Sequence, residues 1–363
     1  MQRDGIVFVL GAGASYSENA PLTSELLYET LTKLGNDEMV NELKEFLRDF
    51  FQVNINQPTM KRLPTFEEAL TMIDIALERQ EDFSASLNNA RLNAIRDSLI
   101  YSMATIVDTS LPNQGKFHDP FVNNIYDLDE DQWRKVSFVN LNYDLLLDNA
   151  IVRLYEGKDL DLDYGIDFRN FVPHVPRDEI QRGEFIYNLE DWAIPREGQS
   201  ILLLKPHGSL NWLYCPTCNT IKTTKTEKGN LRIWRVNETC RYDGSYQKIL
   251  LVPPTWGSSY ENSFLTRISA KTDEALRKAG KVFFVGCSLS DYDIKLKYLF
   301  KRALYTPVSK MQPKITVIQN KKETEEEKIQ LEDRYCRFFG NNIHFDYQGF
   351  EYLSAHVCDF LKD

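Results

Sequence analysis

The sequence predicts an α/β fold with a mostly parallel sheet, and two observations carry that prediction. Short apolar runs of strand length alternate with segments whose apolar residues recur at helical spacing. Glycines or polar residues directly follow these runs, at the strand ends where parallel sheets bind ligands. The runs, with the residues that follow them, are IVFVLGAGAS (6–15), VSFVNLNYD (136–144), ILLLKPHGS (201–209), ILLVPPTW (249–256), KVFFVGCSLSDYD (281–293) and KITVIQN (314–320).

The composition is that of a globular protein and narrows the range of partners. Of the 363 residues, 42% are hydrophobic and 26% are charged. No apolar run reaches the roughly 18 residues of a membrane span. The first apolar run is too short for a signal peptide and lacks a basic segment before it, so we expect a cytoplasmic protein that does not contact membranes. The net charge of −10 argues against direct nucleic-acid binding, because binding phosphate needs a basic surface.

Residues 22–110, between the first and second predicted strands, carry four stretches of apolar residues at helical spacing. The third stretch follows Thr65 and Glu68, which have the spacing of a capping box at a helix start. Four helices are more than one crossover between neighbouring strands needs. We therefore predict a helical insertion, and it is the candidate region for oligomerisation or control.

The rest of the chain divides into a core and a small module. The core comprises residues 1–21, 111–212 and 249–363, which hold all the predicted strands. Residues 213–248 are polar and contain the segments CPTC and CRYDG. We treat the whole chain as one domain that carries this module and the helical insertion.

The cysteines of the small module have the spacing of a metal knuckle. Cys215 and Cys218 form a Cys-x-x-Cys pair, Cys240 follows, and Asp243 stands where a fourth ligand is expected. Structural zinc sites use mostly cysteine and histidine, although carboxylate ligands occur. A structural zinc and a degenerate knuckle with reduced thiols therefore both remain open.

Residues 11–15, GAGAS, stand between the first strand and a predicted helix. Glycines let a pyrophosphate approach the backbone, and a helix N-terminus favours an anion. Tyr16 occupies the place of the third glycine of the dinucleotide fingerprint, and no compelling acidic ribose ligand follows at the usual distance. Alone, the motif fits a nucleotide site and a plain strand-to-helix turn equally well.

Two further polar motifs are ambiguous when each is taken singly. Asn142 or Asp144 suits the N-cap of the helix that follows them. His207, in the segment KPHGS, suits a hydrogen-bonded histidine at a strand end. A structural role is sufficient to explain each motif by itself.

Taken in order, the motifs resemble those of the sirtuin-like NAD-consuming family. The series is GAGAS, NYD, KPHGS, a Cys-x-x-Cys knuckle, VGCSLSD and IQN. It covers nearly the whole chain apart from the helical insertion and the tail. The resemblance implies a Rossmann-like sheet that binds NAD+.

The resemblance also implies roles for individual residues. Asn142 matches the asparagine that faces the nicotinamide ribose, Asp144 matches the aspartate that faces the nicotinamide amide, and His207 matches the catalytic histidine. The residues that match the family's cofactor-binding positions are Gly11, Ala12, Gly13, Ser15, Gly208, Gly286, Ser288 and Asn320.

The chain departs from the deacylating sirtuins directly after the opening loop. Those enzymes continue with Gly-Ile-Pro-Asp-Phe-Arg, whereas residues 19–24 read NAPLTS. The phenylalanine that covers the nicotinamide pocket and the arginine behind it are absent, and the glutamine expected before Asn142 is Leu141. These departures resemble the divergent bacterial branch that hydrolyses NAD+, often as an anti-phage defence effector.

The resemblance thus implies an NAD+ glycohydrolase that releases nicotinamide and ADP-ribose. Cleaving the nicotinamide–ribose bond creates an oxocarbenium-like centre, and the leaving group needs no protonation. Asn142 can position water and a ribose hydroxyl, and His207, with an ordinary pKa of about 6.5, can accept a proton at neutral pH. The alternatives are an NAD-dependent protein deacylase or ADP-ribosyltransferase, and a non-enzymatic NAD or ADP-ribose sensor.

A defence enzyme that depletes NAD+ cannot run constantly in its host, so we expect regulation. We expect a homo-oligomer, with abortive infection as the biological outcome. The resemblance also implies protein partners, including HerA-type ATPases.

Overall fold

The computed structural model describes residues 3–112, 114–155, 161–166, 168, 200–223, 239–240, 242–252, 262–305, 312–320 and 324–362. Within these ranges, no helix is both long and apolar enough to cross a membrane.

A seven-stranded sheet in the order β10-β9-β8-β1-β2-β4-β3 forms the core, and every strand pair in it is parallel. The strands are β1 (Gly5–Leu10), β2 (Val136–Asn140), β3 (Asp161–Asp163), β4 (Ser200–Leu204), β8 (Ala279–Val285), β9 (Lys314–Ile318) and β10 (Ile343–Asp346). The predicted α/β fold with a mostly parallel sheet is confirmed.

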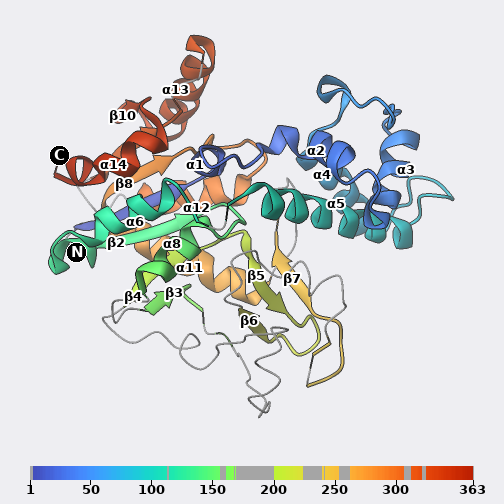
Figure 1. Cartoon of the computed structure of the whole chain (residues 1–363), viewed down its shortest axis with the longest axis horizontal. Helices are drawn as coiled ribbons and strands as arrows, with labels where there is room; N and C mark the ends of the chain where they lie inside the picture. The colour runs from blue at the N-terminus through green and yellow to red at the C-terminus, as the bar shows by residue number, and fades with distance from the viewer. Residues whose placement is uncertain are drawn as a thin grey trace.

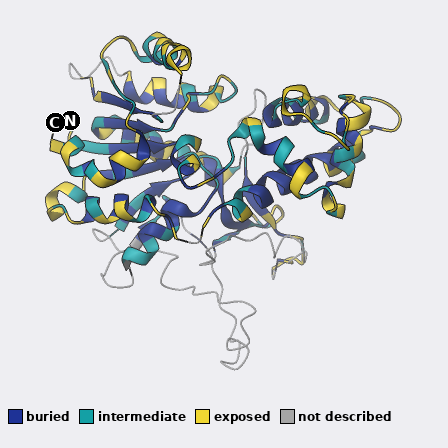
Figure 2. Ribbon diagram, turned by 45° about the horizontal axis from the view of Figure 1, so that its top comes forward, coloured by how far each residue is buried: buried dark blue, intermediate teal, exposed yellow. Residues whose placement is uncertain are grey.

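The central strands are apolar because both faces of the sheet are covered. Phe8 of β1 stacks on Phe283 of β8 at 4.8 Å between ring centroids and on Phe138 of β2 at 6.1 Å. Figure 2 shows this buried layer, with the exposed residues on the outer sides of the surrounding helices and on loops. These helices are α1 (Ala12–Tyr16), α6 (His118–Tyr126), α7 (Glu130–Trp133), α8 (Leu146–Tyr155), α11 (Ser263–Lys278), α12 (Ile294–Leu304), α13 (Glu325–Phe339) and α14 (Gly349–Lys362).

A group of helices stands beside the parallel sheet (Figure 1). It consists of the short 3-10 turns η1 (Thr23–Glu25), η2 (Glu38–Val40) and η3 (Met60–Arg62) and the helices α2 (Leu26–Lys33), α3 (Asn41–Asp49), α4 (Phe66–Arg79) and α5 (Asn89–Ser110). The predicted capping box is present: Thr65 Oγ1 accepts from Glu68 N at 3.1 Å, and Thr65 N donates to Glu68 Oε2 at 2.8 Å. These helices share a second cluster of buried apolar residues.

A three-stranded antiparallel sheet, β6-β5-β7, lies between the seven-stranded parallel sheet and the helices α2–α5. Its strands are β5 (Gly208–Tyr214), β6 (Ile221–Thr223) and β7 (Lys248–Leu251). Leu210 and Leu213 of β5 and Ile249 and Leu251 of β7 belong to the same apolar cluster as the helices α2–α5.

The small sheet changes two details of the sequence-based description. The run at 201–209 is two strands, because β4 ends at Leu204 and β5 begins at Gly208, where a φ of +84° turns the chain. The apolar run at 249–251 pairs with β5 in the small sheet and not with the parallel strands. Apolar composition alone does not tell which of two sheets buries a strand.

Candidate functional site

A cavity of about 440 Å³ opens at the carboxyl ends of β1, β2 and β8, which are neighbours in the sheet. This volume is in the range of small-molecule sites. The predicted site residues that line it are Gly11, Ala12, Gly13, Ser15, Asn142, Asp144, His207, Gly286 and Ser288. The structure thus brings together residues from four separate motifs.

Close packing between two strand-end turns accounts for three of the glycines. A Cβ atom on Gly11 would lie 2.7 Å from Gly286 O, and one on Gly13 would lie 2.7 Å from Gly286 Cα. Gly13 N donates to Gly286 O at 2.8 Å, and Gly286 itself has a φ of +59°. Glycine is therefore required at these positions for the fold, whatever the cavity binds.

Asn142 is held by the GAGAS loop through its amide nitrogen. Nδ2 donates to Gly11 O and to Ser15 Oγ, each at 2.9 Å. No donor among the described residues reaches the amide oxygen of Asn142. Because both N–H groups are used by the protein, the oxygen is the atom left to bind a hydroxyl or a water.

Asp144 is buried, and both of its carboxylate oxygens have protein partners. Oδ2 accepts from Ser15 Oγ at 2.6 Å, and Oδ1 accepts from Leu146 N at 3.0 Å, at the start of α8. The predicted capping role is therefore present, while the same residue also lines the cavity.

A buried lysine fixes the loop that carries Asn142 and Asp144. Lys205 is fully buried, and its Nζ donates to Asp144 O at 2.6 Å and to Asp148 Oδ2 at 3.0 Å. Tyr164 donates to the other oxygen of Asp148 at 2.6 Å. A buried charge pair with further hydrogen bonds to both members resists displacement, because losing one partner leaves the other charge unpaired.

His207 forms an ion pair with a residue from the loop before α12. Its Nε2 lies 2.8 Å from Asp293 Oδ2, and the two side chains are 12% and 13% exposed. Asp293 Oδ1 also accepts from Leu296 N at 3.1 Å, so the carboxylate caps α12. Both members of the pair line the cavity.

The pKa values of the pair shift in opposite directions. Burial disfavours the charged imidazole, but the Asp293 carboxylate and a hydrogen bond to the Val252 backbone outweigh it, so the pKa of His207 is raised. Burial also opposes the charged form of Asp293, but His207 lowers the pKa of that carboxyl below its usual range. Both shifts favour an imidazolium–carboxylate pair.

Gly208 positions His207 but does not line the cavity. A Cβ atom there would lie 1.9 Å from Leu250 O, and the residue has a φ of +84°. His207 O accepts from Val252 N at 2.9 Å, which ties the turn to the end of β7. The His-Gly order therefore has a local cause, because only glycine lets the chain turn so close to β7.

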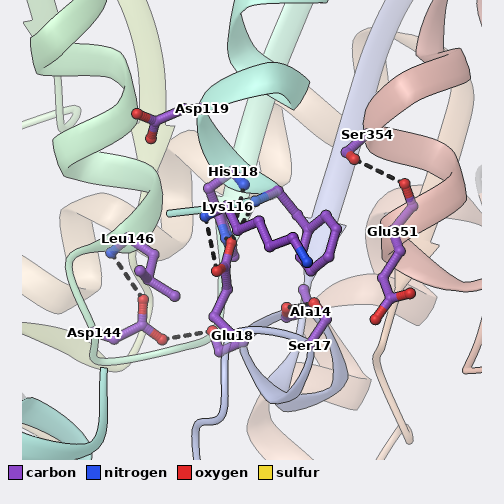
Figure 3. A network of polar contacts seen from close by, with 12 residues as sticks. Ala14, Ser17, Glu18, Lys116, His118, Asp119, Asp144, Leu146, Glu351 and Ser354 are labelled. Carbon is purple, nitrogen blue, oxygen red and sulfur yellow. Dashed lines mark hydrogen bonds and ion pairs between the residues drawn. The ribbon is translucent and has the colours of Figure 1, made fainter. Parts of the chain in front are cut away.

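A second histidine–carboxylate pair, formed by Glu18 and His118, lies close to the GAGAS loop in the chain, since Glu18 follows Ser15 by three residues (Figure 3). Glu18 accepts hydrogen bonds from the backbone N–H groups of Lys116, Phe117 and His118, at 2.9, 2.7 and 3.2 Å. His118 Nδ1 lies 3.2 Å from the same carboxylate. Glu18 thus joins the end of α1 to the start of α6.

The helices beside the sheet supply one wall of the cavity. Pro21, Leu22, Thr23 and Ser24, which stand where the deacylating sirtuins have a different sequence, all line it. The remaining wall residues from this region are Leu26, Phe66, Glu67, Met103 and Val107. Most of this wall is apolar, and Glu67 is its one ionisable side chain among the described residues.

Asn320 lies in a neighbouring cavity of about 540 Å³. Residues that line both cavities are Gly13, Ala20, Pro21, Gly286 and Gln319. The two cavities therefore meet at the packed glycine turns. Asn320 is separate from the group around His207 and belongs to the second cavity.

The predicted knuckle residues Cys215, Cys218, Cys240 and Asp243 come together. One ligand atom from each lies within 4.8 Å of the others. Cys218 Sγ and Cys240 Sγ are 3.5 Å apart, and Cys215 Sγ is 3.4 Å from the nearer oxygen of Asp243. Three thiols and a carboxylate at these separations suit a tetrahedral zinc ion.

Sequence reasoning missed three polar residues of the site: Lys205, Asp293 and Glu67. Lys205 stands next to Pro206 in the quoted motif, and a lysine directly after an apolar strand was a usable signal. Asp293 ends the motif VGCSLSDYD, where its spacing to α12 suggests only a helix cap. Glu67 gives no signal in sequence, because it lies beside the capping residue Glu68 on an ordinary amphipathic helix.

A family model described as a SIR2-like domain matches residues 136–339, which is more than half of the chain. No curated protein matches the sequence.

Several solved structures of Sir2 enzymes are similar to the chain. One, from a study of the mechanism and regulation of Sir2 enzymes, is 13% identical, covers 98% of this chain and 92% of its own, and gives a TM-score of 0.43. Sir2Tm bound to a propionylated peptide is 11% identical, with coverage of 98% and 93% and a TM-score of 0.44. Sir2Af2 bound to a myristoylated histone peptide is 14% identical, with coverage of 82% and 97% and a TM-score of 0.39. On the extent of the family match, the chain belongs to the SIR2-like family.

Proposed function

We propose that this protein is an NAD+ glycohydrolase that releases nicotinamide and ADP-ribose. The observation that carries the proposal is a single cavity lined by Asn142, by the His207–Asp293 pair and by the GAGAS loop. The adjoining second cavity extends the site past Gly13 and Gly286. An elongated ligand such as a dinucleotide suits two adjoining cavities better than a compact ligand does.

The proposed reaction needs no covalent bond between the substrate and the protein. The C1′–N bond of NAD+ breaks, its electron pair neutralises the nicotinamide nitrogen, and water attacks C1′ of the oxocarbenium-like centre. Asn142 would hold the attacking water or a ribose hydroxyl through its free amide oxygen. Positioning of this kind lowers the barrier because the entropy of bringing the reactants together is lost on binding.

The sequence predicts that His207 accepts a proton, and this role is possible only when the imidazole is neutral. A histidine can accept a proton only when a ring nitrogen carries none. The pairing with Asp293 and the contact with Val252 both favour the protonated ring. In this arrangement His207 orients the site, and it would accept a proton only after the ion pair opens.

The test is NAD+ consumption by the purified protein and by cells that express it. We expect wild-type protein in its active state to convert NAD+ to nicotinamide and ADP-ribose. Asn142→Ala and His207→Ala should abolish turnover, whereas Asn123→Ala and His344→Ala, at exposed positions, should not. Full turnover in both site variants would contradict the proposal.

The same assay separates the alternatives. Turnover that appears only with an acylated peptide or an acceptor protein would identify a deacylase or an ADP-ribosyltransferase. Tight NAD+ or ADP-ribose binding without turnover in any state would identify a sensor. The NAPLTS stretch in the cavity wall supports hydrolysis, since it lacks the phenylalanine and arginine of the deacylating sirtuins.

We also propose that the cysteine module binds a structural zinc ion through Cys215, Cys218, Cys240 and Asp243. The convergence of their ligand atoms supports this role over a degenerate knuckle. None of these four residues lines the cavity, so zinc would hold the fold of the small sheet. Metal analysis should find one zinc per chain, and Cys218→Ser together with Cys240→Ser should release it.

We infer a regulated role in anti-phage defence from the resemblance to the divergent bacterial branch. The helices of residues 22–110 are our candidate for a homo-oligomer contact or for a partner such as a HerA-type ATPase. The test is cellular NAD+ during phage challenge, in wild type and in Asn142→Ala. NAD+ loss without phage, or none with phage, would contradict the regulated role.

A further inference from the structure

Glu67 is a buried carboxylic acid in the cavity wall that the proposed mechanism has not used. It is 7% exposed and lies in the first turn of α4, one position before the capping residue Glu68. The residues around it in the wall, including Phe66, Leu26 and Met103, are apolar. An ionisable group in such surroundings needs a reason to be there, because burying a carboxylate is costly.

No cation among the described residues neutralises Glu67. Its carboxylate accepts a hydrogen bond from its own backbone N–H and another from Thr23, and the charge of Glu68 on the same helix acts on it. Lys297 also lines the cavity, but it pairs with Asp291. Burial is the largest influence and raises the pKa of Glu67 above its ordinary value. A raised pKa makes a carboxylate a stronger base near neutral pH.

Tyr143, Glu67 and the His207–Asp293 pair all line the same cavity. The Tyr143 and His207 rings are 6.2 Å apart between centroids. Burial raises the pKa of Tyr143 well above its usual value, and the charges of Asp293 and Glu67 add to that shift. Both carboxylates therefore lie close enough to Tyr143 to act on it electrostatically, although they come from different regions of the fold.

Hydrolysis at C1′ requires a proton acceptor, and His207 is engaged on both sides by Asp293 and Val252. Asp293 itself is bound to His207 and to Leu296 N. Asp144 is bound to Ser15 and Leu146. Three described carboxylates line the cavity: Asp144, Asp293 and Glu67. The two aspartates are held by the partners just named, and Glu67 shares none of those partners.

We propose that Glu67, supplied by the helical region, accepts the proton of the attacking water. The inference rests on the proposed NAD+ glycohydrolase function. The water oxygen bonds to C1′ as the C1′–N bond breaks, nicotinamide leaves as a neutral molecule, and one water proton passes to a Glu67 carboxylate oxygen. The proton returns to solvent after ADP-ribose leaves, so atoms and charge balance.

This assignment gives the helical region a direct part in the chemistry. Glu67 is placed by the apolar cluster of α2–α5, whereas Asn142 and His207 are placed by the parallel sheet and its loops. A shift between the two groups would change the distance between base and reaction centre. Misplacement of a catalytic group by about 1 Å can cost about a hundredfold in rate.

The test compares Glu67→Gln with Glu68→Gln in full-length protein, in the state in which wild type consumes NAD+. Gln at 68 preserves the capping box, so we expect Glu68→Gln to turn over NAD+ as wild type does. Glu67→Gln removes the base but keeps the shape, and we expect turnover to fall by about 10²–10⁴-fold. Binding of ADP-ribose, measured by calorimetry, should be unchanged.

The pH profile supplies a second readout. The charged and titratable groups that interact with Glu67 are Glu68 on its own helix and Tyr143, while the His207–Asp293 pair lines the same cavity. Wild-type turnover should rise with pH as Glu67 loses its proton, and this limb should disappear in Glu67→Gln. Glu67→Asp keeps a carboxylate on a shorter side chain and should recover part of the rate, with a shifted profile.

The outcomes distinguish this inference from the function on which it rests. Wild type that never turns over NAD+ would overturn the glycohydrolase proposal. Wild-type turnover in Glu67→Gln, with His207→Ala inactive, would overturn only the role of Glu67. If Glu67→Gln unfolds, Glu67→Asp decides the matter, and an unchanged rate and pH profile in that variant would overturn the role.

Discussion

The two histidine–carboxylate pairs differ in what surrounds them. His118 and Glu18 are each 2% exposed, and Glu18 follows the GAGAS loop in the chain. His207 and Asp293 are 12% and 13% exposed and line the cavity. Glu18 binds three backbone N–H groups besides its histidine, while Asp293 binds one.

The comparison teaches that pairing alone does not identify a catalytic histidine. The Glu18 carboxylate accepts hydrogen bonds from the backbone N–H groups at the start of α6. The pair therefore holds α6 in place and has a structural role. The Asp293 carboxylate caps α12 with one oxygen and holds the imidazole with the other. What distinguishes the second pair is its place in a cavity that Asn142 also lines.

The largest expected effect is on activity, at the cavity pair. Asp293→Asn removes the charge that orients His207 and favours its protonated form. We expect NAD+ turnover to fall by about 10²–10⁴-fold, measured at a temperature at which circular dichroism shows the variant to be folded. The exposed Asp291, two residues earlier in the chain, supplies the matched control, and Asp291→Asn should keep turnover close to wild type. Normal turnover in Asp293→Asn would make the two pairs equivalent.

The next effect is on stability, at the Glu18–His118 pair. Glu18→Ala leaves three backbone N–H groups and His118 without their acceptor in a buried place. Breaking such a buried pair costs about 3–5 kcal/mol in the free energy of unfolding. Chemical denaturation measures it, with Glu326→Ala at an exposed helix start as control. A loss below about 1 kcal/mol would show that water replaces the carboxylate there.

The pH dependence of stability sharpens the same contrast. Burial would raise the pKa of Glu18, but His118 and the backbone N–H groups of Phe117 and Lys116 outweigh it and lower that pKa to about 2. The folded pKa lies below the unfolded one, so this stabilisation is complete above the unfolded pKa. It is lost as pH falls from about 4.5 to 2 and amounts to about 3 kcal/mol.

Denaturation curves of wild type and Glu18→Gln at several pH values measure this loss. The difference in their free energies of unfolding should shrink as pH falls toward 2, because wild type then carries a protonated Glu18 as well. A difference that stays constant with pH would assign the effect to packing and not to charge.

Much of the parallel sheet could be predicted from sequence, since its strands are short apolar runs followed by glycine or polar residues. β3 and β10 were missed because they are short edge strands with mixed composition. The placement of β7 in the small sheet depends on a tertiary choice. Its Ile249 and Leu251 pack with α2–α5, and neither residue differs in type from those buried by the parallel sheet.

The site residues that could be predicted from sequence are those that belong to the ordered series of motifs. The residues around Asn142 and His207 belong to a series of motifs, and the structure brings that series to one cavity. Asp293 and Glu67 come from other elements and read as helix-start residues in sequence. Their roles depend on which cavity they face, and that follows from packing between distant segments.

The smallest expected effect is on the pKa of Asp293, and it tests which neighbouring group keeps this carboxylate ionised. His207 is the main partner that lowers the pKa of Asp293, and Lys297 adds a weaker contribution. Lys297→Met should therefore raise the pKa of Asp293 by less than about one unit, measured by carbon NMR of the carboxyl group. Lys33→Met, at an exposed ion pair away from Asp293, is the control. A larger shift would mean that Lys297, and not His207, keeps Asp293 ionised. The cavity pair would then differ from Glu18–His118 in the group that keeps its carboxylate charged, as well as in its surroundings.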